Sequence, residues 1–468
     1  MFERVLVANR GEIAVRVIRS LHELGVEAVA VHSSADDDAL HVRLADRAVR
    51  IGPPAAAQSY LNVRALIAAA ETTGCEAVHP GYGFLAENPA FVHACAENDL
   101  VFIGPSAEVM ARMGDKAQAK LELKAAGVPL VPGTDGSASL AEARAAAADL
   151  GYPILLKAVA GGGGKGMRLV EEEEQLDRAY STASAEAEAA FGDGSLYVEK
   201  VIVPARHVEV QVLCDAEGGV LTLGERECSI QRRHQKLIEE SPSPALTPAL
   251  REEIEAAAER ACRHLGYRNA GTFEFLVGPD GSFAFIELNA RLQVEHPVTE
   301  LVTGMDIVRE QVRIAAGEPL PVTGRAPRRG HAIEVRINAE DPEHAFAPSP
   351  GTITRFRPPQ GPFVRFDTFV EDGAVISPYY DSLVGKLIVW DVDRAGAIAR
   401  ALRALDELEL EGVATTSEFA AGVLASRPFA TGEYSTSFLE EQVPRSRRLD
   451  GGDQRAEVAA LRARERET

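Results

Sequence analysis

The sequence of 468 residues predicts an α/β (α+β) protein whose first part is built on a parallel β-sheet. Three observations favour this class. Short apolar segments alternate with amphipathic helical segments over the first hundred residues. Polar, glycine-containing loops follow two of the apolar segments. Runs with strand periodicity then dominate 204–300 and return after about residue 330.

The N-terminal elements follow from the spacing of apolar residues. A helix is predicted in 11–25, where apolar residues recur every three or four positions and Gly25 ends the pattern, and another in 62–74. Strands are predicted at 5–8, 27–34, 76–79 and 100–104. Parallel sheets bind ligands at the carboxyl ends of their strands, so the loops 9–12 and 79–88 are candidate site loops, with plain connecting loops as the alternative.

The stretch AGGGGKGM (160–167) poses a separate question. Its glycines fit a dinucleotide fingerprint at Gly161, Gly163 and Gly166, but the segments on both sides, 153–159 and 167–170, resemble strands rather than a strand and a helix. A Walker loop is excluded, because Gly166 stands where Ser or Thr is required. The remaining interpretation is a glycine turn that acts as hinge and phosphate loop, since no Cβ keeps a phosphate from its N–H groups.

The segment 272–297 predicts a hairpin that gathers carboxylates around the turn signal GPDG (278–281). If Gly278 pairs with Gly281, Glu274 lies opposite Phe285 and Thr272 opposite Glu287. This register puts Thr272, Glu274, Phe285, Glu287 and Asn289 on one face, with Glu274 and Glu287 as diagonal neighbours. Two carboxylates so close repel each other, and a hard cation such as Mg²⁺ would remove the repulsion.

Polar residues continue in alternation through Glu287, Asn289, Arg291, Gln293 and Glu295. An amphipathic strand with a solvated face explains alternation alone, whereas this order of side chains beside Glu274 favours a site. Either an extended chain or a bend before 295 would keep the groups close. A basic island, defined by Arg226, Arg232, Arg233, His234 and Lys236, predicts an oxyanion or phosphate site or else a solvated turn. The strand 206–213 puts His207, Glu209 and Gln211 on one side.

Composition limits the classes of function. The 46% apolar and 25% charged residues are typical of a globular protein, and the net charge of −21 argues against nucleic-acid binding. We find no run of 18 apolar residues and no leader segment, so we expect no membrane span and no secretion. Five scattered cysteines without a CxxC pair suggest reduced thiols and a cytoplasmic location.

Taken in order, several long motifs resemble biotin carboxylase, an ATP-grasp enzyme, over roughly residues 2–445. They are VLVANRGEIAVRVIR, HPGYGFLAEN, MGDK, KAVAGGGGKGM, RHVEVQVL, ECSIQRRHQK, FEF, IELNARLQVEHPVTE and EVRINAEDP. The resemblance implies a Rossmann-like parallel-sheet domain (1–112), an ATP-grasp domain (113–330) with a mobile lid (about 131–203), and a C-terminal biotin carboxylase domain (331–445). A charged tail (446–468) follows.

Carried over motif by motif, the resemblance implies the site residues. Lys116 and Lys157 would contact phosphates beneath Gly163 and Gly164. The remaining ATP ligands would be Met167, Glu199, Lys200, Val201, Ile202, His207, Gln231, His234, Glu274 and Glu287. Mg²⁺ or Mn²⁺ would bind Glu274 and Glu287 with Asn289 close by. Bicarbonate would meet Lys236, Arg291, Gln293 and the backbone of Val294. The implied catalytic residues are Arg291, Lys236, Glu295 as general base, and Arg336, which would stabilise the biotin anion.

The implied reaction is ATP- and bicarbonate-dependent carboxylation of biotin on a separate carrier protein, the first half-reaction of an acetyl-CoA or other acyl-CoA carboxylase in fatty-acid synthesis. The sequence shows no biotinylation motif of the MKM type, so a carrier protein, carboxyltransferase subunits and a homodimer are the expected partners. The alternatives are another ATP-grasp ligase, a propionyl-, methylcrotonoyl- or pyruvate-type subunit, and a non-enzymatic nucleotide-binding subunit. Ala160, Lys165 and Ala290 depart from residues common in the family, which leaves only the kinetics of the lid in doubt.

Overall fold

The structure is a computed structural model that describes residues 1–159 and 166–442, apart from the side chains of Lys116, Ala117 and Gln442. The predicted loop residues Gly163 and Gly164 and the predicted tail (446–468) lie outside the described residues. The domain limits inferred from the sequence stay predictions.

The N-terminal part is a parallel sheet with strand order β3-β2-β1-β4-β5, as predicted. Its elements are β1 (Arg4–Val7), α1 (Gly11–Glu23), β2 (Glu27–Ser33), α2 (Leu40–Leu44), β3 (Arg47–Gly52), α3 (Val63–Thr73), β4 (Ala77–His79), α4 (Pro89–Glu97), β5 (Val101–Phe102) and α5 (Ala107–Gly114). The predicted strands and helices are confirmed. The spacing of apolar residues did not indicate β3, because this edge strand keeps most of its side chains partly or fully exposed.

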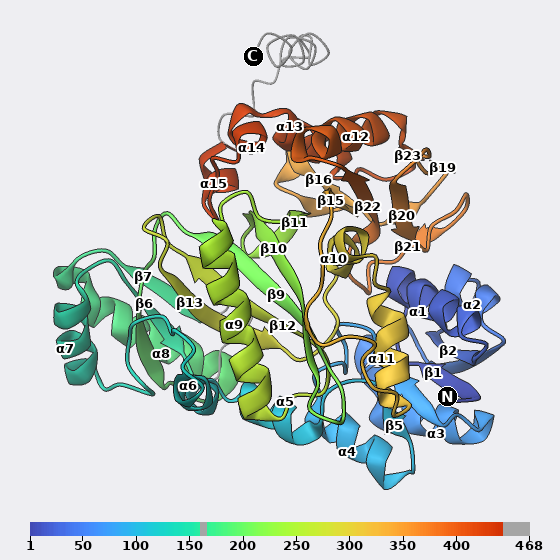
Figure 1. Ribbon diagram of the computed structural model, residues 1–468, viewed down its shortest axis with the longest axis horizontal. Helices are drawn as coiled ribbons and strands as arrows, with labels where there is room; N and C mark the ends of the chain where they lie inside the picture. The colour runs from blue at the N-terminus through green and yellow to red at the C-terminus, as the bar shows by residue number, and fades with distance from the viewer. Residues whose placement is uncertain (160–165, 443–468) are drawn as a thin grey trace.

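The two candidate loops of this sheet meet at one edge. They follow β1 and β4, which are neighbours, and the Asn9 amide donates hydrogen bonds to the carbonyls of Pro80 and Tyr82 at 2.7 Å each. The carboxyl ends of two adjacent parallel strands therefore form a single surface, which faces the rest of the molecule (Figure 1).

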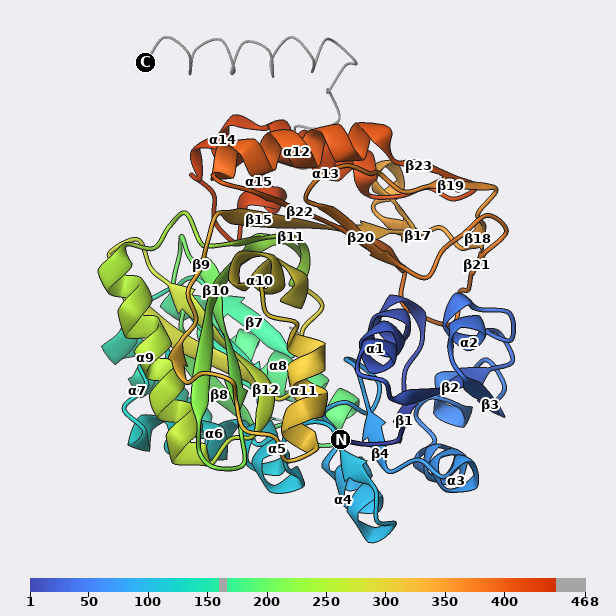
Figure 2. The same ribbon diagram turned by 45° about the vertical axis from the view of Figure 1, so that its right-hand side comes forward.

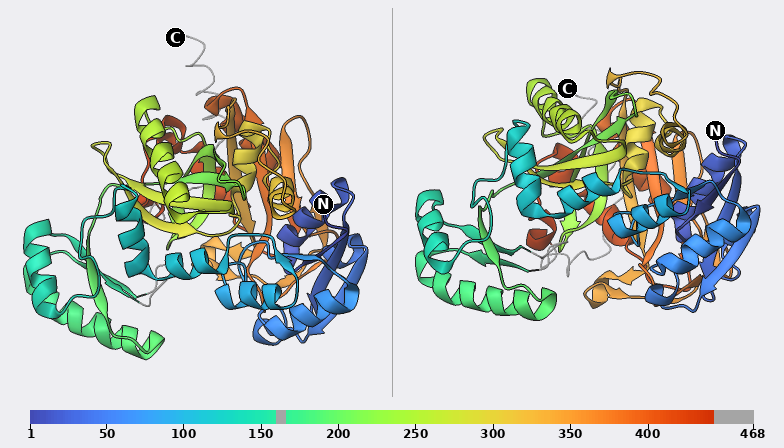
Figure 3. Two further views of the ribbon diagram at one scale, coloured as in Figure 1. Left: turned by 60° about the horizontal axis from the view of Figure 1, so that its bottom comes forward. Right: turned by 90° about the horizontal axis from the view of Figure 1, so that it is seen from below.

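A small antiparallel sheet with strand order β7-β6-β8 forms a unit that projects from the body of the molecule (Figure 3). It follows α6 (Lys116–Ala125) in the chain. Its elements are α7 (Leu140–Leu150), β6 (Ile154–Ala158), β7 (Met167–Val170), α8 (Leu176–Phe191) and β8 (Leu196–Lys200). The prediction that strands lie on both sides of the glycine stretch is confirmed, since β6 and β7 pair directly.

The main sheet follows the order β13-β12-β9-β10-β11-β15-β22-β20, with β14 paired to β10 off this path. Its strands are β9 (Arg206–Cys214), β10 (Val220–Arg232), β11 (Gln235–Ser241), β12 (Asn269–Val277), β13 (Phe283–Asn289), β14 (Gly324–Arg325), β15 (His331–Asn338), β20 (Val364–Thr368) and β22 (Leu383–Asp391). The antiparallel pair β11–β15 carries this sheet across the predicted domain limit at 330. The C-terminal strands thus lie above both other parts (Figure 2).

Helix α9 (Pro248–Leu265) covers one face of the first strands of this sheet (Figure 1). Val208 and Val210 of β9 and Phe273 and Phe275 of β12 form an apolar core with that helix. Because strand side chains alternate between faces, His207, Glu209, Thr272 and Glu274 must point to the opposite face. This alternation builds the polar floor of the candidate site.

The remaining elements complete the body around the sheet. They are α10 (His296–Thr303), α11 (Ile307–Ala315), β16 (Glu340–Asp341), β17 (Ala347–Pro348), β18 (Gly351–Thr352), β19 (Arg355–Arg357), β21 (Val375–Ile376), α12 (Arg394–Glu407), β23 (Glu409–Glu411), α13 (Ser417–Ala425), α14 (Arg427–Thr431) and α15 (Phe438–Gln442), with three short 3₁₀ turns. The predicted helix at 394–408 is α12.

Glu240 on β11 fastens the C-terminal helices to this sheet. Its buried carboxylate accepts hydrogen bonds from His331 at 2.6 Å, from Arg394 at 2.7 and 2.9 Å, and from the Tyr434 hydroxyl. Burial alone would favour the protonated form, but His331 and Arg394 lower the pKa of Glu240 to about 2.

Replacing Glu240 by glutamine is therefore expected to destabilise the protein in a pH-dependent way. A depressed folded-state pKa stabilises above the unfolded value of 4.5, and this contribution disappears as the pH falls towards 2. It corresponds to about 3 kcal/mol. Melting temperatures of the parent and Glu240→Gln should differ most at pH 7 and converge as the pH falls from about 4.5 towards 2. A constant difference at every pH would contradict the prediction.

Candidate active site

The predicted hairpin exists, but its register differs from the prediction. Glu274 lies directly opposite Glu287, Thr272 opposite Asn289 and Phe275 opposite Phe285, with a register shift between the pairs of Glu274 and Phe275. Phe285 therefore points to the α9 face and packs with Phe273 and Phe275, so its predicted place on the polar face was wrong. The irregularity at residue 286 returns Glu287 to the face of Glu274.

Lys236 on β11 is the centre of the site. Its ammonium group donates to the carboxylates of Glu209 at 2.5 Å, Glu295 at 2.6 Å and Glu274 at 2.8 Å. Burial opposes a charged ammonium here, but the three carboxylates raise the pKa of Lys236 well above its ordinary value. The residue is thus a permanent cation in a buried setting.

Two acids of this cluster have opposite protonation tendencies. Burial favours the protonated form of Glu295, but Lys236 and Arg336 hold its pKa well below the ordinary value. In Glu209 burial and the negative charge of Glu295 raise the pKa. Glu274 resembles Glu295, because Lys236 and His207 overcome burial and lower its pKa. The His207 ring lies 3.0 Å from Glu274, which in turn raises the pKa of His207 against the effect of burial.

The chain bends after β13, so the alternating polar residues do not continue as a strand. Residues 290–295 form a loop, and Glu295 occupies the N-cap position of α10. The bend keeps the groups together as expected, with Gln293 donating to Glu274 at 3.1 Å. Arg291 donates to Asn289 at 2.9 Å and to Gln293 at 3.1 Å, and its Nε reaches Glu87 of the N-terminal loop at 2.8 Å.

Arg336 on β15 closes the other side of the site. Its guanidinium donates to Glu295 at 2.9 Å and to Glu239 at 2.6 Å. Burial raises the pKa of Glu239 to about 7, with Arg336 opposing that rise and Glu295 adding to it. Lys236 and Arg336 therefore bind the two oxygens of the Glu295 carboxylate from opposite sides.

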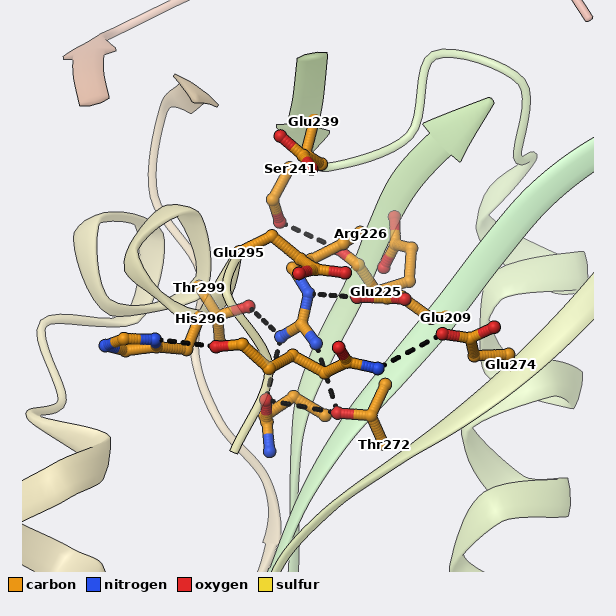
Figure 4. A network of polar contacts seen from close by, with 12 residues as sticks. Glu209, Glu225, Arg226, Glu239, Ser241, Thr272, Glu274, Glu295, His296 and Thr299 are labelled. Atoms are coloured by element: carbon orange, nitrogen blue, oxygen red, sulfur yellow. Dashed lines mark hydrogen bonds and ion pairs between the residues drawn. The ribbon is translucent and has the colours of Figure 1, made fainter. Parts of the chain in front are cut away.

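Only part of the predicted basic island belongs to this centre. Arg226 is fully buried and donates to Glu209 at 2.5 Å, to Gln211 at 2.8 Å, and to Thr299 and Thr272 (Figure 4). The guanidinium of Arg232 stacks on the Phe346 ring, 4.1 Å from its centroid. Of the five, Lys236 contacts all three carboxylates of the centre, and Arg226 contacts one of them, Glu209. Arg232 ends β10, and Arg233 and His234 lie in the turn before β11, so these three are separated from the centre.

The predicted nucleotide residues form a second group between α6 and the small sheet. Lys157 on β6 pairs with Glu199 on β8 at 2.7 Å, and Lys120 on α6 pairs with the other oxygen of Glu199 at 2.8 Å. Tyr197 lies beside both lysines. Its pKa is raised, mainly by burial and further by the negative charges of Glu199 and Glu287.

The other predicted nucleotide residues take the following positions. Lys200 donates to the carbonyls of Gly151 and Tyr152, and Met167 pairs with Lys157 in the small sheet. Val201 and Ile202 connect that sheet to β9, and Gln231 lies 3.4 Å from the His207 ring. His234 is exposed in the β10–β11 turn, and Lys116 begins α6.

The oxygen donors on the hairpin fit a hard divalent cation. Glu274 and Glu287 face each other across β12 and β13, and crowding by protein together with the charge of Glu274 raises the pKa of Glu287. A cation between them would relieve this repulsion, and carboxylates are the ligands Mg²⁺ prefers. The Asn289 oxygen accepts from Arg291, while its amide donates to Glu274 at 3.0 Å, so Asn289 orients a carboxylate here.

Several residues of the site were absent from the predicted set. They are Glu87, Lys120, Glu239 and Lys386, the last of which donates to the Val294 carbonyl at 2.8 Å. Glu87 lies in a loop that was predicted as a site loop, and Lys120 one helical turn after Lys116. Glu239 and Lys386 reach the site only through the pairing of β11, β15 and β22. No local sequence pattern predicts how these three strands pair.

Three family models match the chain. "Biotin carboxylase, N-terminal domain" matches residues 1–110, "Carbamoyl-phosphate synthase L chain, ATP binding domain" residues 115–323, and "Biotin carboxylase C-terminal domain" residues 334–441. Together these models span most of the described residues.

Relatives resemble the chain over nearly its whole length. A biotin carboxylase of Nostoc sp. is 52% identical, with 94% of this chain and 99% of the relative covered. A pyruvate carboxylase subunit of Methanothermobacter thermautotrophicus is also 52% identical, over 94% of this chain and 90% of the relative. A solved structure from Hydrogenobacter thermophilus superimposes with a TM-score of 0.90 at 48% identity, covering 94% and 98% of the two chains. Its description is a biotin carboxylase domain dimer of 2-oxoglutarate carboxylase with MgADP, ADP and bicarbonate.

Proposed function

Because this chain belongs to the biotin carboxylase family and has its ATP-grasp fold, we propose that it uses ATP and bicarbonate to carboxylate biotin on a separate carrier protein. One observation in the site carries the proposal. Lys236 and Arg336 each donate a hydrogen bond to a different oxygen of the Glu295 carboxylate, so this base lies between two cations. Such a base can deprotonate an anion that the cations attract.

Bicarbonate is proposed to bind between the bend and Lys236 of β11. Lys236, Arg291 and Gln293 supply donors to its oxygens, and the Val294 N–H supplies a backbone donor. Glu295 removes the proton of bicarbonate, and the oxygen then attacks the γ-phosphorus of ATP, which forms carboxyphosphate and releases ADP. Phosphoryl transfer needs positioning and charge neutralisation more than covalent help from the protein.

The phosphates of ATP are proposed to lie between Lys116, Lys157 and the carboxylate hairpin. Mg²⁺ or Mn²⁺ held by Glu274 and Glu287 would neutralise charge on the phosphate oxygens. Lys157 and Lys120 share the Glu199 carboxylate, so Glu199 would keep Lys120 as a partner of opposite charge when Lys157 turns to a phosphate.

The depressed pKa of Glu295 makes it a weak base while Lys236 and Arg336 both contact it. A bicarbonate ion beside Lys236 and Arg291 would share the positive charge of Lys236 and raise the pKa of Glu295 towards the working pH. The base would thus strengthen when its substrate arrives. Carboxyphosphate then breaks down to CO₂ and phosphate, the phosphate takes the proton of the biotin ureido nitrogen, and Arg336 would stabilise the resulting biotin anion until it captures CO₂.

The direct test measures ATP cleavage and carboxybiotin formation by the purified chain with free biotin. Cleavage should require bicarbonate and rise with biotin, with carboxybiotin as product. Equal ATP cleavage without biotin, and no carboxybiotin, would exclude the function. A panel of amine substrates tests the alternative, another ATP-grasp ligase that proceeds through an acyl phosphate. Such a ligase would cleave ATP in response to an amine and would not respond to biotin.

The metal assignment gives its own prediction. Glu287→Gln should preserve the melting temperature, because the loss of solvent around Glu287 and the repulsion by Glu274 outweigh the attraction of Lys236 and His207 for its charge. It should lower turnover at ordinary Mg²⁺ about 10²-fold or more, since one charged ligand is lost. Steady-state rates over a Mg²⁺ titration are the measurement, with Glu252→Gln on the surface of α9 as the matched control. Unchanged turnover at low Mg²⁺ would remove Glu287 from the metal site.

The product is proposed to feed a carboxyltransferase that acts on acetyl-CoA or another acyl-CoA in fatty-acid synthesis. A pyruvate-type enzyme is the second candidate, favoured by the 52% identity to the archaeal pyruvate carboxylase relative. A carrier protein and a second copy of this chain are the proposed partners, the latter by likeness to a dimeric relative. Among the described residues, none of the helices combines the length and apolarity needed to cross a bilayer. All five cysteines are free, which supports a cytoplasmic location.

A further inference from the structure

We propose that His296 and Lys386 are positioning residues that fix the turn Gln293–Glu295, so that its Val294 N–H and its Glu295 carboxylate both face bicarbonate. This inference rests on the proposed function and deepens it. Neither residue belongs to the predicted site. Both are fully buried, and each donates to one of two consecutive carbonyls in the turn.

His296 holds the first carbonyl. Its Nδ1 lies 2.8 Å from the Gln293 oxygen, and its backbone N–H reaches the same oxygen at 3.3 Å. A carbonyl oxygen only accepts, so Nδ1 must carry the hydrogen. Burial and the positive charges of Lys386, Arg16 and Arg365 hold the pKa of His296 well below its ordinary value. The ring is therefore a neutral donor with a fixed tautomer.

The geometry of the peptide bond transmits this contact to the site. In a trans peptide the C=O and the following N–H point in opposite directions. Since the Gln293 carbonyl points to His296, the Val294 N–H of the same peptide must point away from that ring. No residue that the structure describes accepts a hydrogen bond from this N–H. A fixed, unpaired backbone donor suits a small anion here, because the next residue, Glu295, has its carboxylate on the cation Lys236.

Lys386 holds the second carbonyl. Its ammonium group lies 2.8 Å from the Val294 oxygen and 3.1 Å from the carboxylate of Glu12, in the first turn of α1. On the adjacent strand Lys386 pairs directly with Arg336. The two cations thus donate to consecutive residues of the turn: Lys386 to the Val294 carbonyl and Arg336 to the Glu295 carboxylate.

The test compares three substitutions of His296 by steady-state kinetics. His296→Leu removes the donor and should raise the KM for bicarbonate about tenfold, while the KM for ATP stays within about twofold of the parent. His296→Asn can place an amide N–H near the position of Nδ1 and should restore the KM for bicarbonate. His296→Gln, whose amide lies one bond further out, should behave like leucine and keeps a polar side chain in case leucine prevents folding. His22→Leu, on the surface of α1, is the matched control.

A merely structural role would lower the melting temperature and all kinetic constants together, and would give no difference between asparagine and glutamine. Equal KM values for bicarbonate in the asparagine and glutamine variants would overturn the inference. Lys386→Met gives a second measurement, because it should show the same split between bicarbonate and ATP. A parent that forms no carboxybiotin overturns the proposed function, whereas an active parent whose His296→Leu and Lys386→Met variants keep its KM for bicarbonate overturns this inference alone.

Discussion

Glu295→Gln is expected to lower carboxybiotin formation by about 10²- to 10⁴-fold, the usual contribution of a positioned general base. Glutamine has nearly the same shape and can still accept one hydrogen bond from Lys236 or Arg336, so the fold of the site should persist. What disappears is the ability to accept the proton of bicarbonate. Single-turnover carboxylation with saturating ATP and bicarbonate measures the loss without interference from product release.

A matched control is available in the same ion network. Glu239 is the other carboxylate on Arg336, and burial raises its pKa to about 7, so it is partly protonated near neutral pH. Glu239→Gln imitates that protonated form and should change the rate by less than about tenfold. Equal losses in both variants would mean that Glu295 acts by holding Arg336 and not as the base.

Arg226→Met is expected to destabilise the protein by about 3–5 kcal/mol, the cost of removing one partner of a buried ion pair. The fully buried guanidinium reaches Glu209, Gln211, Thr299 and Thr272, and methionine can replace only its aliphatic stem (Figure 4). Glu209 would then depend on Lys236 alone for compensation of its charge. Urea denaturation followed by circular dichroism measures the loss.

A double-mutant cycle separates this pair from general packing. Glu209→Gln should recover part of the stability that Arg226→Met loses, because the carboxylate that needs the guanidinium is then absent. Activity of the double variant should stay low, since Lys236 would have one partner fewer. Strictly additive losses in the free energy of unfolding would show that Arg226 contributes only by filling space.

Single helices and strands could be predicted because each depends on residues that are close together in the sequence. Helix α1 follows from apolar residues at helical spacing, and the strands beside the glycine stretch from short apolar runs between turns. The gathering of Glu274, Asn289, Arg291, Gln293 and Glu295 also followed from one segment of chain, and the structure brings these side chains together.

The register of the hairpin was wrong for a physical reason. The prediction counted outward from the turn and assumed a regular ladder. In the structure, Phe275 pairs with Phe285 on the apolar face, and Glu274 pairs with Glu287 on the polar face. Both pairs can form because the ladder contains an irregularity at residue 286. Both the right face for Glu287 and the wrong one for Phe285 follow from this single extra residue.

Arg226, Glu239, His296 and Lys386 required the three-dimensional structure. The predicted basic island treated nearness in sequence as nearness in space, but Arg226 lies within β10 beside Glu209, whereas Arg233 and His234 lie in the turn after that strand. Arg226 therefore serves as a buried support, and Lys386 comes from a strand 92 residues beyond the carbonyl that it holds. Such pairings depend on the order of strands in the sheet, which no short stretch of sequence encodes.

The ladder between β11 and β15 has a practical consequence for anyone who dissects this protein. A truncation after residue 330 would leave β11 as an open sheet edge, with the carbonyl and N–H groups that now meet β15 unpaired. Such edges recruit other strands, so an isolated ATP-grasp fragment should aggregate instead of folding as a free unit. Fragments for structural or biotechnological use should keep β15, β22 and β20 together with the preceding chain.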